Sequence, residues 1–194
     1  MKQSGREVPI MISVTVLDIA GRTLSGQTLE AFMASMQHVN IFSIGLNCSF
    51  GAKQLKPFLE TLSNKSSYYI SAHPNAGLPN SLGQYDQTPE EMAEQVAEYV
   101  DEGLVNIIGG CCGTTEKYIE LYSDIIKDKL PHVKGKVNNN LRLSGLELFE
   151  KSPEINFVNV GERCNVAGSR KFLRLINEKK YDEALQIARA QVED

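Results

Sequence analysis

The chain has 194 residues, of which 42% are hydrophobic and 23% charged, and its formal net charge at pH 7 is −4. This composition is typical of a soluble globular protein with one full domain or parts of two. Because phosphate groups are bound by basic surfaces, the acidic balance argues against nucleic acid and anionic membrane surfaces as partners. No apolar run approaches the ~18 residues that cross a bilayer, so no membrane-spanning segment is expected.

The apolar stretch Val8–Leu17 allows two interpretations. It follows Lys2 and Arg6 and has the length of the apolar part of a secretory signal peptide. However, Glu7 interrupts the basic region, and no A-x-A cleavage site follows Leu17. The β-branched residues of this stretch are typical of a buried strand, and we predict a strand here.

Amphipathic helices and apolar strands alternate from here to about residue 130. The first helix is predicted to follow Ser25 or Thr28, either of which could cap it. Further strands are predicted at Ile41–Leu46, Tyr68–Ala72 and Leu104–Ile108. The helices are predicted from apolar residues that share one face: Leu29, Phe32, Met33 and Met36; Leu55, Phe58, Leu59 and Leu62; Met92, Val96, Tyr99 and Val100; and Tyr118, Ile119, Tyr122, Ile125 and Ile126.

The third helix has the clearest predicted ends. Thr88 is placed as its N-cap, Pro89 as its first residue, and Glu91 as the partner that completes a capping box. Gly103 is predicted to end this helix. In the second helix, Pro57 is tolerable only in the first turn, because a later proline removes a backbone hydrogen bond.

Near-continuous apolar strands that alternate with amphipathic helices predict an α/β fold, in which helices cover a parallel sheet. Four such βα units make half of a (β/α)8 TIM barrel, which usually needs about 250 residues. An open doubly wound sheet is the competing architecture. The alternation stops after Pro131. We therefore predict a first domain at residues 1–130, a linker at 131–154 and a second domain at 155–194, which begins with a strand at Ile155–Val160 and continues with two short helices.

Three cysteines follow predicted strands directly. Cys48 lies in the motif GLNC after the second strand, and Cys111 and Cys112 lie in GGCCG after the fourth. The carboxyl ends of parallel strands meet at one edge of the sheet, where ligands bind. We therefore expect the three thiols to converge, and the glycines on either side of the doublet leave the backbone free to turn.

Three protein thiolates on Zn²⁺ leave its fourth tetrahedral position open, which is typical of a catalytic zinc site. A substrate thiol bound in that position would lose its proton. A redox pair is the alternative interpretation of the Cys111–Cys112 doublet. Cys164 is interpreted as a small buried hydrophobic residue and not as a ligand. Without a secretory signal, a disulfide framework is not expected, and a reducing cytoplasm is the predicted location.

The motifs GLNC, PNAGLPN and GGCCGTT resemble the homocysteine-binding domain of the cobalamin-dependent methionine synthase family. The segment NFVNVGERCNVAGSRKF resembles the start of that family's next module, the methyltetrahydrofolate-binding (pterin-binding) barrel. GGCCG alone is shared with other homocysteine methyltransferases, whereas the downstream segment is specific to the cobalamin enzymes. The resemblance runs from about Val8 to the end of the chain. It implies the C-terminal half of one TIM barrel, followed by the first strand and helices of a second.

The resemblance also implies a chemistry. Cys48, Cys111 and Cys112 would bind Zn²⁺, and homocysteine would bind the zinc as a thiolate that attacks the methyl group of methylcobalamin to give methionine. Methyltetrahydrofolate would then recharge the cobalamin. Asn75, in the PNAG motif, matches a residue near the amino-acid end of homocysteine, although shaping a turn is the alternative role.

Three further residues are assigned with this resemblance in view. His73 is expected to pack or to form hydrogen bonds and not to bind metal. Glu162 and Asn165 match positions that line the pterin pocket of the second module.

The chain departs from the family pattern in three ways. The family's first barrel has four more βα units before Val8, its folate barrel continues beyond the segment present here, and no cobalamin-binding module follows. The chain is therefore expected to be a fragment that is inactive in isolation. A non-catalytic zinc-binding remnant and one chain of a split enzyme are the alternatives. A homocysteine methyltransferase with a small methyl donor such as betaine is a third, against which GERCNVAGSR argues.

Overall fold

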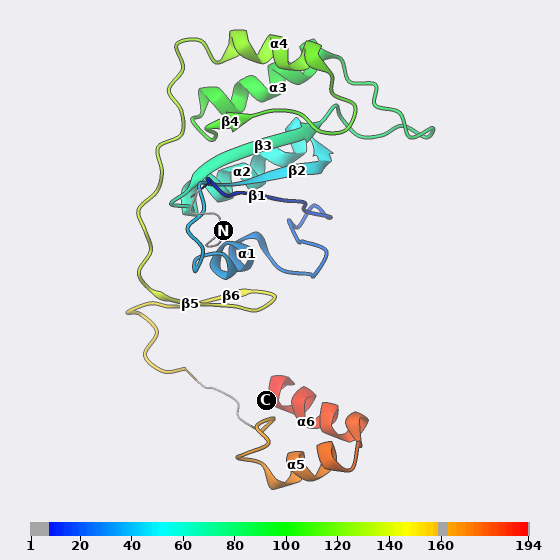
Figure 1. Ribbon diagram of the computed structural model, residues 1–194, viewed down its shortest axis with the longest axis vertical. Helices are drawn as coiled ribbons and strands as arrows, with labels where there is room; N and C mark the ends of the chain where they lie inside the picture. The colour runs from blue at the N-terminus through cyan, green and yellow to red at the C-terminus, as the bar shows by residue number, and fades with distance from the viewer. Residues whose placement is uncertain (1–7, 159–162, 194) are drawn as a thin grey trace. The chain divides into compact units, whose positions relative to one another are not determined.

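A computed structural model describes residues 8–158 and 163–193. The chain divides into two compact units, with the boundary between Lys151 and Ser152. The first unit contains a parallel sheet whose strands lie side by side in chain order (Figure 1). These strands are β1 (Met11–Val14), β2 (Ser43–Gly51), β3 (Tyr69–Asn75) and β4 (Ile107–Ile108).

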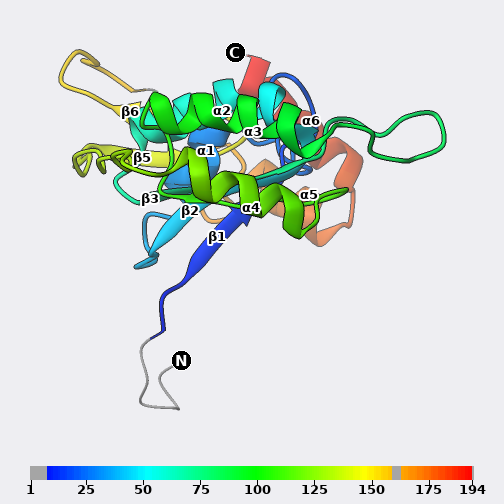
Figure 2. The ribbon, with the colours of Figure 1, turned by 90° about the horizontal axis from the view of Figure 1, so that it is seen from above.

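A helix follows each of these strands: α1 (Leu29–Ser35), α2 (Ala52–Lys65), α3 (Pro89–Asp101) and α4 (Glu116–Ile125). Each helix contacts the next one along the chain, and Figure 2 shows α2 and α3 side by side. A doubly wound sheet would reverse its strand order at a switch point and send helices to both faces. The order β1-β2-β3-β4 therefore confirms the predicted α/β sheet of βα units, and it is consistent with part of a (β/α)8 barrel.

The centre of the hydrophobic core lies between the sheet and α2, and residues of α1, α3 and α4 extend it. Ile44 of β2 and Ile70 of β3 are register partners, and both are fully buried. They belong to one cluster with Leu55 and Leu59 of α2, which are also fully buried. Because burying a side chain of this size stabilises the fold by about 1.5–3 kcal/mol, this layer holds the strands in fixed positions beneath their carboxyl ends.

Small residues occupy the next register row, where β2 and β3 come close together. Gly45 of β2 is the register partner of Ser71 of β3. A Cβ atom at Gly45 would lie 2.0 Å from the Ser71 side-chain oxygen and 2.1 Å from its carbonyl oxygen. No residue with a side chain fits at this position without moving one of the strands.

The helix ends agree with most of the predictions. Thr88 and Glu91 form the complete capping box, and Gly103, with φ of 64°, follows the end of α3. Thr28, rather than Ser25, caps α1 by accepting a hydrogen bond from the Ala31 amide.

The prediction for Pro57 was wrong, because α2 begins at Ala52 and Pro57 is its sixth residue. The missing hydrogen bond is the one that would reach the carbonyl of Lys53. Lys53 and Pro57 are both exposed, so that carbonyl lies on the solvent side of the helix. Water can therefore replace the missing donor, and the helix continues.

The two outer strands are shorter than predicted. Only Met11–Val14 of the stretch Val8–Leu17 pairs with β2, and only Ile107–Ile108 of Leu104–Ile108 pairs with β3. Among the described residues, each outer strand has a neighbour on one side only. A strand with one partner has no second ladder of hydrogen bonds to extend its regular part.

Residues 131–154 were predicted to be a linker, but they contain a β-hairpin of β5 (Leu141–Ser144) and β6 (Leu148–Lys151). The hairpin packs against α1, and the Ser144 hydroxyl donates a 2.7 Å hydrogen bond to the Ala31 carbonyl. The segment LRLSGLELFEK alternates leucine with polar residues around a Ser-Gly turn. This alternation is a hairpin signal that the linker interpretation missed.

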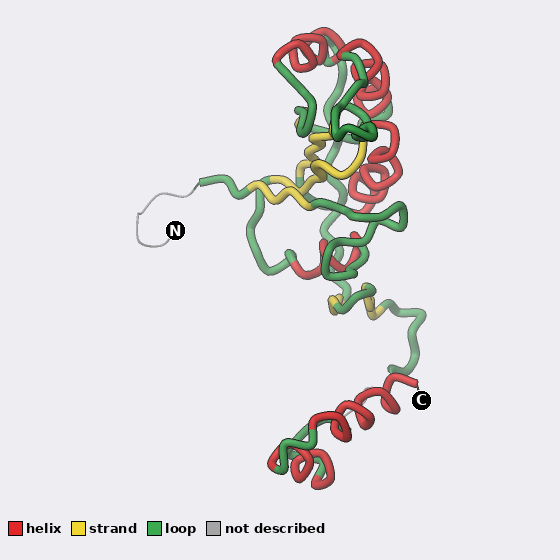
Figure 3. Tube along the Cα trace, turned by 90° about the vertical axis from the view of Figure 1, so that its right-hand side faces the viewer, coloured by secondary structure: helices red, strands yellow, loops and turns green. Residues whose placement is uncertain are grey.

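The second unit contains α5 (Arg170–Asn177) and α6 (Tyr181–Glu193), as the two predicted helices (Figure 3). The strand predicted at Ile155–Val160 is not observed in its described part, since residues 155–158 are in no strand. The remainder of that strand lies outside the described residues. The start of a second barrel therefore stays a prediction. No helix in the described parts of the chain combines the length and the apolar character needed to span a membrane.

Candidate metal centre

The structure brings together the three cysteines that were predicted to converge. Cys48 lies in the last part of β2, and Cys111 and Cys112 lie in the loop between β4 and α4. The Sγ atom of Cys48 is 3.6 Å from that of Cys112, which is 3.9 Å from that of Cys111. All three sulfurs lie within 4.8 Å of one another, and all three thiols are free and half-buried.

These distances fit a tetrahedral zinc ion. A Zn–S bond is about 2.3 Å long, so two thiolates on one tetrahedral zinc lie about 3.8 Å apart. The Cys48–Cys112 and Cys111–Cys112 sulfur separations, 3.6 and 3.9 Å, bracket that value. The donor set is also suitable, because zinc favours thiolate ligands and three of them leave one position for a substrate. The geometry thus favours a three-thiolate metal site.

A backbone irregularity in β2 directs the Cys48 side chain. Cys48 has φ of 61° and Ser49 has φ of 60°, in the left-handed region that side-chain-bearing residues rarely adopt. The register between β2 and β3 shifts between Asn47 and Gly51, as in a β-bulge. Bulges of this kind re-aim a side chain beside a functional site. Asn47 directly precedes this irregularity, and its side chain accepts a 2.7 Å hydrogen bond from the Ser13 hydroxyl.

The loop that carries the doublet is held by backbone hydrogen bonds to the end of β3. The Cys111 amide donates to the Pro74 carbonyl at 2.8 Å, and the Ala76 amide donates to the Cys112 carbonyl at 2.9 Å. The Thr114 hydroxyl donates to the Cys111 carbonyl at 2.7 Å. Together these bonds fix both cysteine backbones against a strand whose position the core determines.

Asn75 lies inside this network. Its side chain is 2% exposed, and its Oδ1 atom accepts a 3.1 Å hydrogen bond from the Cys112 amide. The structure therefore places Asn75 between the two strand ends that supply the cysteines. A contact between Asn75 and homocysteine stays a prediction.

The three thiols differ in acidity. Burial acts to raise the pKa of Cys48, but hydrogen bonds from the Ser49 amide, the neighbouring thiols and Asn75 outweigh it, so this pKa is lowered. Burial, together with hydrogen bonds to Cys48 and Cys112, raises the pKa of Cys111 to about 11. Cys48 is therefore the more readily ionised of these two in the metal-free protein.

Two other residues approach the site. The imidazole of His73 lies against Gly109, where an added Cβ would be 2.6 Å from its Cδ2 atom, and burial lowers the pKa of His73. The group that could hold a metal ion among the described residues consists of the three cysteines. A packing role for His73 stays a prediction. Tyr85, which the sequence interpretation missed, lies against Gly113.

The remaining predicted residues belong to the second unit. Cys164 is half-buried there and is not a member of the three-cysteine group. The Asn165 side chain accepts a 2.9 Å hydrogen bond from the Ala167 amide, in the turn before α5. Glu162 lies outside the described residues. A pterin-binding role for Glu162 and Asn165 thus stays a prediction.

The comparison with known families agrees with this site. Residues 1–126 match the family described as homocysteine S-methyltransferase. The match covers the parallel sheet, its four helices and all three clustered cysteines. The chain therefore belongs to the homocysteine S-methyltransferase family.

Proposed function

We propose that this chain supplies the zinc centre of a methyltransferase that converts homocysteine to methionine. The observation that carries the proposal is the separation of the cysteine sulfurs, 3.6 and 3.9 Å, which matches three thiolates around one tetrahedral ion. When bound, zinc would favour the thiolate form of the homocysteine sulfur, which is the nucleophile in methyl transfer. Membership of the homocysteine methyltransferase family supports the choice of substrate.

The protein's own part in this chemistry is to place three sulfurs before the substrate arrives. Cys48 is fixed by the bulge in β2, and the doublet is fixed by the hydrogen bonds to Pro74, Asn75 and Ala76. A preorganised donor set leaves one coordination position for the substrate sulfur. We also propose that Asn75, buried beside the cysteines, lies close to the amino-acid end of bound homocysteine.

For the methyl donor we propose methylcobalamin, recharged by methyltetrahydrofolate. The support is the resemblance of NFVNVGERCNVAGSRKF to the start of a pterin-binding barrel. On this proposal, Glu162 and Asn165 would contact the pterin, and residues 155–194 would begin the second barrel. The proposed linker at 131–154 would include the hairpin that packs against α1. A small methyl donor would need no such segment.

Methyl transfer is proposed for an assembled barrel rather than for these four units alone. In the part of the chain that the structure describes, β1 and β4 each pair on one side only. A closed (β/α)8 barrel needs eight strands, so another four βα units would have to complete this sheet. One chain of a split enzyme fits the same observation.

Zinc binding is tested by X-ray absorption on the zinc-loaded chain. We expect about one zinc per chain, with mainly sulfur neighbours, and loss of this metal when Cys111 and Cys112 are both replaced by serine. The matched control is Cys164→Ser, which should leave the zinc content unchanged because Cys164 belongs to the other unit. Mainly oxygen and nitrogen neighbours, or full zinc retention in the double variant, would contradict the proposal.

A further inference from the structure

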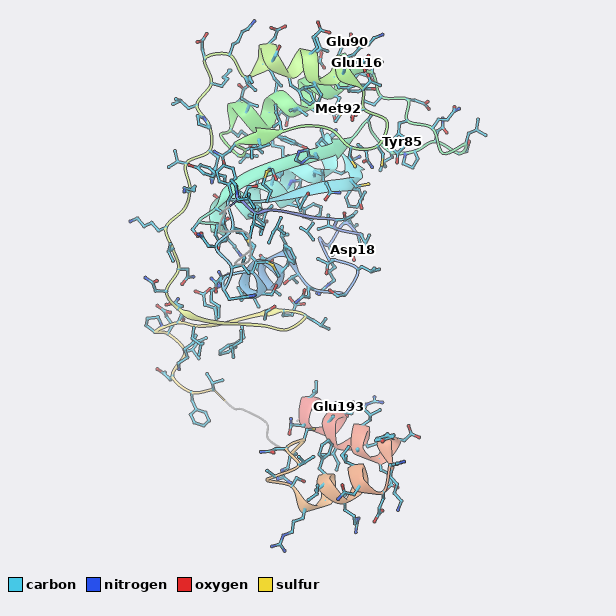
Figure 4. All side chains as sticks on the ribbon, in the orientation of Figure 1. Asp18, Tyr85, Glu90, Met92, Glu116 and Glu193 are labelled. Atoms are coloured by element: carbon cyan, nitrogen blue, oxygen red, sulfur yellow. The ribbon has the colours of Figure 1, made fainter. Side chains whose placement is uncertain are left out.

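A cavity of about 440 Å³ lies at the amino-terminal end of the sheet. It is lined by Ile41, which comes just before β2, and by Ser66, which comes just before β3. One of its walls is formed by residues 134–138, which lead from α4 to the hairpin. In Figure 4, Asp18 after β1 and Tyr85 after β3 mark the opposite, carboxyl end of the sheet, where the cysteines lie. The cavity is therefore separate from the metal centre.

Four cationic side chains line this cavity, and none of the described residues that line it is acidic. Lys65 comes from the last turn of α2, Lys134 and Lys136 from the wall segment 134–138, and Arg142 from β5. The Lys134 ammonium also lies over the Tyr69 ring, 4.3 Å from its centroid. Three segments of the chain thus bring positive charge to one space. These charges repel one another unless an anion lies between them.

Arg142 is the clearest sign of a missing ligand. Its side chain is only 6% exposed, and its Nε atom has no hydrogen-bond partner among the described residues. The Glu150 carboxylate lies 3.2 Å from Nε without forming a hydrogen bond, and the Asn138 and Asn140 side chains donate to its other oxygen. A buried charged donor without a hydrogen bond is costly. An acceptor in the adjoining cavity is the partner that this guanidinium lacks.

The surroundings of the cavity stay positive when the neighbouring carboxylates are included. Glu30 pairs with Lys65 at 2.9 Å, as Glu150 does with the guanidinium. The carboxyl end of α2 adds only a partial negative charge, about half a unit. Lys134 and Lys136 form no ion pair with any residue that the structure describes. Two cations are therefore left for a ligand, which matches an anion with two negative charges.

The wall segment 134–138 is tied to the sheet through its backbone. The Gly135 amide donates a 3.0 Å hydrogen bond to the Ser66 carbonyl, and an added Cβ at Gly135 would lie 2.7 Å from that oxygen. Just before the wall segment, the His132 carbonyl accepts a 2.8 Å hydrogen bond from the Asn106 side chain. The lysines on either side of Gly135 are thus attached to a backbone that is already in place, which lowers the entropic cost of binding.

We propose that this cavity binds a phosphate group, either free or carried by a small organic molecule. The fork of an arginine and the point charges of lysines are the usual partners of phosphate. The volume is that of a pocket for a small molecule rather than for one phosphate, so an organic phosphate is the favoured source. This site lies beyond the proposed methyl-transfer function and does not depend on it.

Isothermal titration calorimetry of the full chain in about 0.15 M NaCl tests the site, with inorganic phosphate and ribose 5-phosphate as probes. We expect saturable binding with a dissociation constant below about 1 mM. Tighter binding of ribose 5-phosphate identifies an organic phosphate, and equal binding identifies free phosphate. Arg142→Gln should weaken binding at least about tenfold, because it removes hydrogen bonds to a charged group. Lys136→Gln removes one exposed charge and should weaken it about threefold.

Arg189→Gln is the matched control, since it removes the same charge from an exposed position in the second unit and should leave the affinity unchanged. Hydrogen exchange of the unmodified chain gives a readout that does not depend on how Arg142→Gln folds. We expect ribose 5-phosphate, or phosphate if it binds equally, to slow exchange of the amides of residues 134–142. Absence of saturable binding, unchanged affinity in Lys136→Gln, an equal loss in Arg189→Gln, or unchanged exchange at 134–142 overturns the inference.

Discussion

At the scale of single residues, Cys48 and Ser49 have the least common backbone conformation near the site. Two successive residues with side chains have φ near +60°, which costs roughly 1–2 kcal/mol for each. The conformation is maintained because β2 is held on both sides of the bulge, at Asn47 by the Ser13 hydroxyl and at Gly51 by pairing with Asn75. Strain that is held in this way is characteristic of functional sites.

Replacing Ser49 by glycine should therefore stabilise the protein. Relief of about 1–2 kcal/mol of strain exceeds the entropic cost of glycine, about 0.5–1 kcal/mol. We expect the free energy of unfolding, measured with urea, to rise by about 0.5–1 kcal/mol. Ser123→Gly in helix α4 is the control. Glycine relieves no strain there and brings only its entropic cost, so this variant should lower the free energy of unfolding by a similar amount. A loss of stability in Ser49→Gly would show that the serine side chain, and not the backbone, decides this position.

The unequal acidity of the thiols gives a pH-dependent prediction for the metal-free chain. The pKa of Cys48 is lowered and that of Cys111 is raised to about 11. Because the thiolate is the reactive form, Cys48 should be alkylated at lower pH. At pH 8 we expect iodoacetamide to modify Cys48 at least about tenfold faster than Cys111.

Peptide mapping by mass spectrometry after short exposures measures both rates. Cys48 and Cys111 are both half-buried, so access alone does not separate them. The rate at Cys111 should still be rising as the pH approaches 11. Equal rates over the whole pH range would contradict the assignment, and zinc loading should protect both residues.

At the scale of elements, α3 and α4 begin in different ways. Thr88 caps α3 because its side-chain oxygen accepts a hydrogen bond from the Glu91 amide, whereas Thr115 at the start of α4 makes no side-chain cap. The two helices pack against each other, and α4 is the helix that follows the cysteine doublet. The ends of these helices therefore help to hold the loop that carries Cys111 and Cys112.

This difference predicts unequal effects for the same substitution. Thr88→Ala should lower the free energy of unfolding by about 1 kcal/mol, the usual effect of losing an N-cap. Thr115→Ala removes no cap hydrogen bond and should change it by no more than about 0.5 kcal/mol. Thermal and urea unfolding of both variants measure the contrast. Similar losses in the two variants would mean that the capping box contributes nothing beyond the presence of threonine.

At the scale of the whole molecule, the four parallel strands that the structure describes in the first unit form a sheet with two open edges. Of the described strands, β1 and β4 each have one partner, and Met11 of β1 is 51% exposed. Unpaired strand edges are templates for pairing with another chain. Since a domain's net stability is a small difference between large terms, a sheet without its closing strands is expected to be marginal on its own.

We therefore expect the isolated chain to self-associate through β1 and to show negligible methyl transfer from methylcobalamin to homocysteine. A lysine on an edge strand opposes such pairing, so Met11→Lys should weaken association by about 1 kcal/mol, roughly a fivefold change in the dissociation constant. Sedimentation velocity measures the change. Leu130→Lys adds the same charge at an exposed position outside the sheet and should have little effect. A monodisperse monomer with measurable turnover would contradict both expectations.

The sequence by itself determined the features that depend on neighbouring residues. The alternation of strands and helices, the Thr88 capping box and the two helices of the second unit follow from local patterns, and the structure confirms them. The convergence of the cysteines was also predictable, because strand ends in a parallel sheet meet at one edge. Each of these inferences needs only a short segment and one general rule of packing.

Only the tertiary structure decided the features that join distant segments. The Asn75 side chain accepts from the Cys112 amide, and Tyr85 packs on Gly113. The left-handed backbone at Cys48 likewise depends on the pairing of β2 with β3. In each case the energy that fixes the residue comes from a partner far away along the chain, so no local pattern carries the information.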